Sequence, residues 1–161
     1  MWLVTSSFYG YIPSLFMLTL NIILIIIEQK LQNMIPEKIV FLFVLAFFFI
    51  VFIQSGVDKI YDHKGNLAFL NDLLKTYFSP PLIAFALIVV TIFELISGIL
   101  CIIGIVDFIF NKSNFIGLLG LIIGSFALLI LLFGQRVSKN YDGAKTIAIY
   151  FILAMIGIAL A

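Results

Sequence analysis

The chain has 161 residues, of which 64% are hydrophobic and 11% are charged, and its net charge is +1. A soluble domain is about half apolar and about a quarter charged, so this composition indicates an integral membrane protein. The length leaves room for one bundle of short-looped helices and for no separate soluble domain. The near-neutral charge gives nucleic-acid binding no electrostatic support, and a single cysteine, Cys101, excludes an intrachain disulfide. We expect Cys101 to be a small packing residue.

The first apolar segment runs from about residue 11 to residue 27. It is short for a helix that must cross about 30 Å of hydrocarbon, so residues 8–10 would have to contribute. We predict an N-terminal hydrophobic helix within residues 1–32, spanning the membrane or, alternatively, lying at its interface. Because the first basic residue is Lys30, the segment lacks the positive start of a cleavable signal peptide.

The second apolar segment, residues 39–54, is apolar on every face, which is typical of a helix in lipid or deep in a bundle. After it comes the only long connection, residues 57–80. A turn is expected at residues 62–66, where Gly65 can adopt a positive φ. Leucine and aromatic residues then recur at helical spacing over residues 67–78, with polar residues opposite. This pattern predicts an amphipathic helix that lies on the bilayer or caps the bundle and ends at a pair of prolines.

Three more apolar segments follow, at residues 81–106, 115–134 and 144–161. The remaining connections are short, at residues 28–38, 107–114 and 135–143. Short connections make consecutive helices antiparallel neighbours. The sequence therefore predicts an all-α, multi-pass transmembrane helical bundle in contact with the lipid bilayer.

An acidic residue, Glu94, lies near the middle of the third segment. An acid at a helix centre in the membrane costs about 2.5–3.5 kcal/mol, so it is expected to have a partner or a task. One interpretation is that Glu94 is paired or protonated and only stabilises the packing; the other is that it lines a site. Together with Glu94, the candidate buried polar site consists of Gln54, Ser55, Lys59 and Arg136. The two cations lie just outside the apolar segments, and their long stems can extend inward.

Small residues share helix faces with this acid. Glu94, Ser97, Gly98, Cys101 and Gly104 fall on one face of a helix, which is therefore expected to point into the bundle. The next two segments carry similar sets, and the predicted packing positions there are Gly117, Gly120, Gly124 and Gly157. Small residues let a second helix backbone approach closely.

Other chemistry has little support in the sequence. The only histidine, His63, lies in a polar turn and is expected to be solvated. One histidine and one cysteine argue against a metal site built on these ligands and against bis-histidine haem ligation. Neither a Ser-His-Asp arrangement nor a glycine-rich phosphate loop is indicated. Basic residues number six in the connections 57–80 and 135–143, with Lys145, against three on the opposite side, which favours the first side as cytoplasmic.

Three motifs occur in a recognisable order. Residues 54–59 read QSGVDK, Glu94 is followed four residues later by Gly98, and residues 134–144 read GQRVSKNYDGA. In these motifs, and in the amphipathic connection that follows the first of them, the chain from about Ile39 onward resembles the DoxX family of small four-helix membrane proteins. The matching family patterns are Ser-Gly-x-x-Lys, E-x-x-x-G and G-Q-R-x-x-K-x-Y-x-G-A.

The chain departs from the family in two places. Glu37-Lys38 stands where the family often has an arginine, and residues 1–32 precede the family core. The resemblance implies a DoxX-like four-helix membrane domain over residues 33–161. The family's usual topology would place both lysine-rich connections outside, against the charge count, so the orientation stays open.

The resemblance also implies a function. We expect a non-catalytic subunit, anchor or assembly factor of a larger complex in the bacterial cytoplasmic (inner) membrane, with other membrane subunits as partners and no activity alone. The alternative is a membrane subunit of a quinone-linked oxidoreductase, similar to thiosulfate:quinone oxidoreductase, in which Glu94 handles protons. No cofactor is predicted, apart from quinone under that alternative.

Overall fold

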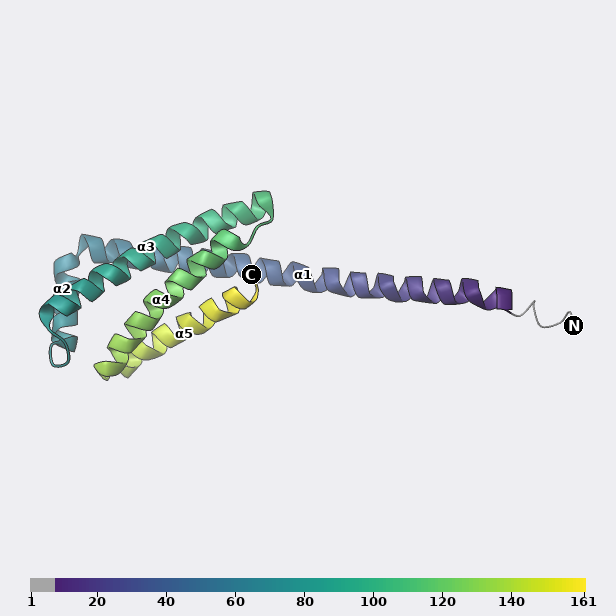
Figure 1. Ribbon diagram of the computed structural model, residues 1–161. Helices are drawn as coiled ribbons and strands as arrows, with labels where there is room; N and C mark the ends of the chain where they lie inside the picture. Colours follow the sequence, from purple (N-terminus) through teal and green to yellow (C-terminus); the bar gives the residue numbers. More distant parts are fainter. Residues whose placement is uncertain (1–7) are drawn as a thin grey trace, which may run out of the picture. The chain divides into compact units, whose positions relative to one another are not determined.

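The computed structural model describes the backbone of residues 8–161 and the side chains of residues 17–18, 20–25 and 36–161. These residues form five helices and no strand: α1 (Phe8–Tyr61), α2 (His63–Leu74), α3 (Pro80–Asn111), α4 (Phe115–Val137) and α5 (Tyr141–Ala159) (Figure 1). The chain divides into two units, one ending at Ile39 and the other comprising Val40–Ala161, and α1 contributes to both. The predicted all-α fold is confirmed.

In the first unit, the predicted connection at residues 28–38 is wrong, because these residues are helical. Its glutamate, glutamine, lysine, leucine and methionine residues are good helix formers, and their polarity alone does not end a helix. The described apolar side chains between Met17 and Ile25 are exposed. Part of the predicted N-terminal helix of residues 1–32 lies outside the described residues, and its role stays a prediction.

Within the described residues, four helical segments are long and apolar enough to cross a membrane: Pro36–Tyr61, Pro80–Asn111, Phe115–Val137 and Tyr141–Ala159. At a rise of 1.5 Å per residue, α3 is about 48 Å long, more than the roughly 30 Å of hydrocarbon that it has to cross. The chain is therefore a multi-pass membrane protein.

The boundaries around α2 differ from the expected ones. The turn is limited to Asp62, whose side chain accepts a hydrogen bond from the Gly65 backbone N–H at 3.0 Å. This N-cap starts the helix four residues earlier than predicted, and Gly65 has no positive φ. The prolines also act differently from the prediction: α2 ends at Leu74, and Pro80 and Pro81 begin α3, where the missing N–H groups remove no helical bond.

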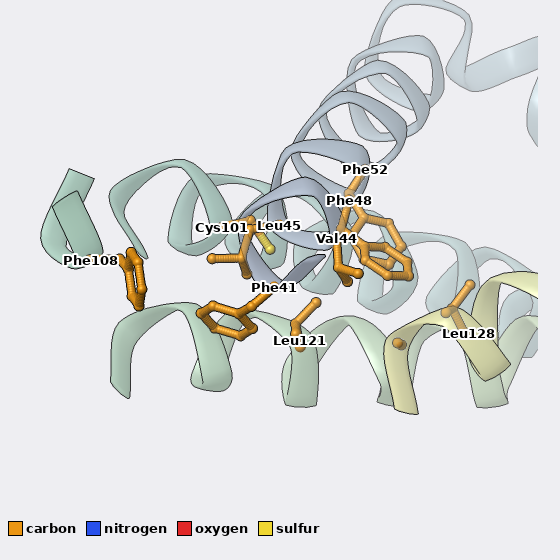
Figure 2. Close-up of a cluster of buried hydrophobic side chains, with 10 residues drawn as sticks. Phe41, Val44, Leu45, Phe48, Phe52, Cys101, Phe108, Leu121 and Leu128 are labelled. Atoms are coloured by element: carbon orange, nitrogen blue, oxygen red, sulfur yellow. The ribbon is translucent and has the colours of Figure 1, made fainter. Parts of the chain in front are cut away.

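The core of the second unit is built on one face of α1. Its side chains Phe41, Val44, Leu45, Phe48 and Phe52 pack against residues of α3, α4 and α5 (Figure 2). The rings of Phe48 and Phe52 stack with centroids 5.1 Å apart. Cys101 is fully buried in this cluster, as expected of a packing residue.

Glycines set the spacing between the helices. Gly104 of α3 and Gly117 of α4 meet backbone to backbone: a Cβ at Gly104 would lie 2.5 Å from the Gly117 nitrogen and still closer to its Cα. Gly124 leaves room for Phe52, and Gly157 leaves room for Val44. Predicted burial is confirmed for Glu94, Ser97, Gly98, Cys101, Gly104, Gly117, Gly120, Gly124 and Gly157.

Candidate functional site

Two glycines bring α1 close to α3 next to Glu94. A Cβ on Gly56 would lie 2.6 Å from Leu95, and a Cβ on Gly98 would lie 2.8 Å from the side chain of Ile53 and 3.2 Å from its backbone nitrogen. Both glycines are buried. Their small size lets the two helix backbones approach until side chains of α1 can contact Glu94 directly.

Glu94 forms an ion pair with Lys59. Lys59 Nζ lies 2.9 Å from Glu94 Oε2 and 3.1 Å from Oε1, so it contacts both carboxylate oxygens. Ser55 Oγ donates a hydrogen bond to Glu94 Oε1 at 3.2 Å and accepts one from Lys59 Nζ at 2.5 Å. Ser55 and Lys59 can both reach the acid because residues four apart share a helix face.

The ion pair is largely buried, with side-chain exposures of 14% for Lys59 and 2% for Glu94. Two opposite charges in mutual contact have no net charge, and their hydrogen bonds offset part of the desolvation cost of burial. Of the two interpretations of Glu94, this geometry supports a paired residue that joins α1 to α3.

The other two candidate residues lie elsewhere. Gln54 is exposed, because one residue before Ser55 the helix has turned by about 100°. Arg136 is also exposed, and its guanidinium lies 5.1 Å from the ring centroid of Tyr141. The expectation that Arg136 could extend inward to Glu94 fails, because α5 offers it an aromatic partner close by.

The remaining buried hydroxyls of α3 and α4 are also satisfied. Ser97 Oγ of α3 donates to the Gly120 carbonyl of α4 at 2.7 Å, which links the two helices. Thr91 and Ser125 each donate to a carbonyl one turn earlier in their own helix, at 2.7 Å. These hydroxyls therefore contribute to packing.

A cavity of about 350 Å³ lies beside the ion pair, and the sequence did not predict it. Its wall consists of the apolar face of α2, the first part of α3 and the last part of α4. Lys59 belongs to the lining, whereas Glu94 does not. The only related feature in the sequence was the amphipathic pattern of α2. It indicated that the apolar face of this helix is covered, but not how completely the neighbouring helices fill the space beneath it.

Metal-binding clusters are absent from the described residues, where no group of three or more histidine, cysteine, aspartate or glutamate side chains comes together. His63, expected to be solvated, is exposed.

Comparisons of the chain with protein-family models, with curated proteins and with solved structures gave no match. The resemblance to the DoxX family stays a prediction from the three sequence motifs.

Proposed function

We propose that this chain is a non-catalytic membrane component, acting as a subunit, anchor or assembly factor of a larger membrane complex. The observation that carries the proposal is the engagement of Glu94. Both of its carboxylate oxygens contact Lys59, and one also accepts from Ser55. The acidic side chain, whose transfer into the membrane has a high free-energy cost, therefore serves the packing of α1 on α3.

The small-residue faces add to this argument. The Gly120–Gly124 pattern is used inside the chain, since Gly120 lies against Cys101 and Gly124 against Phe52. It is therefore occupied and does not serve a partner helix. Large apolar side chains between Met17 and Ile25 are exposed, and lipid or a neighbouring transmembrane helix would cover them. The resemblance to the DoxX family favours the bacterial cytoplasmic membrane as the location of the complex.

Purification of the tagged chain from native membranes in a mild detergent tests the proposal, with mass spectrometry to identify companions. We expect a reproducible set of membrane proteins in stoichiometric amounts. A variant lacking residues 1–32 is expected to lose them while its remaining helices stay folded. Recovery of a stable, partner-free monomer from native membranes would contradict the proposal.

The alternative, a quinone-linked subunit in which Glu94 handles protons, has less support. The acid is engaged by Lys59 and does not line the cavity. That alternative requires Glu94→Gln to abolish quinone-dependent turnover by the native complex even where the complex assembles normally. Unchanged turnover in such a complex would exclude it.

A further inference from the structure

The cavity between α2, α3 and α4 has features of a ligand site. Its volume of about 350 Å³ lies at the lower end of the range of about 300–1,000 Å³ typical of small-molecule pockets. Its lining is mostly apolar and includes Leu70 and Leu73 of α2, Leu87 of α3 and Leu131 of α4. A pocket of this size and polarity suits one hydrocarbon chain better than the two chains of a phospholipid.

Helix α2 is packed incompletely over this cavity. None of its residues is fully buried, whereas Ile83 and Leu87 on the facing helix α3 are. Four apolar side chains of α2 line the cavity: Phe69, Leu70, Leu73 and Leu74. An apolar occupant would complete the burial of this α2 face, which the protein's own side chains leave unfinished.

The polar residues of the lining decide the charge of the occupant. They are Lys59, Asn66 and Gln135. The ammonium group of Lys59 is already engaged by Glu94 and Ser55, so a second anion there would face the Glu94 carboxylate, and a cation would face the ammonium. The cavity therefore disfavours a charged head group of either sign.

One of these polar residues has an atom without a hydrogen-bond partner. Gln135 Oε1 is buried and accepts no hydrogen bond. This oxygen packs against Gly143 of α5, where a Cβ would lie 2.7 Å from it. The oxygen is therefore closed off from the cavity, which Gln135 lines with its other atoms, and the amide NH₂ of Gln135 has two donors that a ligand hydroxyl can accept from. Gln135 lies near the end of α4, so a hydroxyl here and a hydrocarbon chain along the leucines would match the two ends of an amphiphile.

We propose that this cavity binds a neutral single-chain amphiphile, with its hydroxyl accepting a hydrogen bond from the amide NH₂ of Gln135 and its hydrocarbon chain packed between α2, α3 and α4. The site requires neither a partner subunit nor turnover, so it is independent of the function proposed above.

Two probes with the same chain and different head charge test this proposal: oleyl alcohol and oleate. The full chain is placed in phosphatidylcholine nanodiscs, and bound probe is measured by native mass spectrometry. We expect one oleyl alcohol per chain and at least tenfold weaker retention of oleate. Because both probes partition into lipid, each is compared between the wild type and Ala86→Phe, which fills the cavity. Ala68→Phe, on the exposed side of α2, is the matched control.

Ala86→Phe is expected to reduce oleyl alcohol binding at least tenfold, and Ala68→Phe to leave it unchanged. Gln135→Leu is expected to weaken binding about fivefold, the effect of one lost hydrogen bond. If Ala86→Phe lowers the helical content, Leu73→Trp fills the same cavity from α2. Equal retention of the two probes, no binding of oleyl alcohol, or full binding by a folded cavity-filled variant would each overturn the proposal.

Discussion

Lys59 and Glu94 are 35 residues apart in the chain, yet Lys59 Nζ lies 2.9 Å from Glu94 Oε2. One residue comes from the last turn of α1 and the other from near the middle of α3. The pair therefore reports directly on the packing of these two helices.

Glu94→Gln is expected to lower the free energy of unfolding by about 3–5 kcal/mol, because it leaves the ammonium of Lys59 buried without a counter-charge. Unfolding of the purified chain in mixed micelles, followed by circular dichroism, measures this change. Glu37→Gln, at an exposed position, is the matched control and is expected to have no measurable effect. A Glu94→Gln variant as stable as the wild type would show that the ion pair does not stabilise the bundle.

The double variant Lys59→Met/Glu94→Gln is expected to recover most of that loss. With no charge left, the remaining groups are compatible with an apolar setting, and replacing a buried pair with uncharged side chains is often neutral. The same unfolding measurement on the wild type, both single variants and the double variant gives the coupling energy of the pair. If the stability losses of the two single variants add up to the loss of the double variant, the direct contact between the two residues would be contradicted.

Gly104→Ala is expected to destabilise the bundle by about 1–3 kcal/mol, because the new methyl group would collide with the backbone of Gly117 rather than with a movable side chain. Gly134→Ala is the matched control: its Cβ would lie 3.9 Å from the nearest neighbouring side chain, Leu74, at ordinary contact distance. There we expect no loss, and a gain of up to about 1 kcal/mol from the better helix former. Equal effects of the two substitutions on thermal unfolding would refute the close approach of α3 to α4.

Ser97→Ala is expected to cost about 0.6 kcal/mol, the typical value for one interhelical hydrogen bond in a membrane protein. Ser125→Ala removes a hydroxyl that bonds only to its own helix and is expected to change the stability less. Replicate unfolding curves for the two variants separate these cases; the reverse order would argue against the Ser97–Gly120 link.

Asp62→Ala is expected to destabilise the start of α2 by about 1 kcal/mol through loss of its N-cap. Hydrogen exchange should speed up in residues 63–66 and stay unchanged in α4. Asp58→Ala, four residues earlier on the exposed surface of α1, is the comparison. The same acceleration in both variants would mean that the cap does not hold this helix end.

The sequence correctly predicted structural features that depend on a single helix. The length of the apolar runs predicted the spans, and the spacing of Glu94, Ser97, Gly98, Cys101 and Gly104 predicted the buried face of α3. The spans depend on the length of apolar sequence and the buried face on helical periodicity, and neither requires knowledge of contacts between helices. Both ends of α2 were missed, because Asp62 was interpreted as part of a longer turn and the helix was expected to continue to the two prolines, which instead begin α3.

The site depends on contacts between helices, and there the prediction was incomplete. Ser55 and Lys59 were among four candidates, but choosing them over Gln54 and Arg136 requires the rotation of α1 against α3 and the position of Tyr141. The cavity was not predicted at all, because it arises where α2 fails to fill the space beside α3 and α4. No local pattern encodes such a shortfall in packing.

The position of Lys59 also bears on biogenesis. The ribosome delivers α1 before α3, so the counter-ion is already in place when the acidic helix leaves the translocon. If α3 is released laterally next to α1, the Glu94 carboxylate meets Lys59 and does not enter the acyl region unpaired. In this way α1 would assist the membrane insertion of α3.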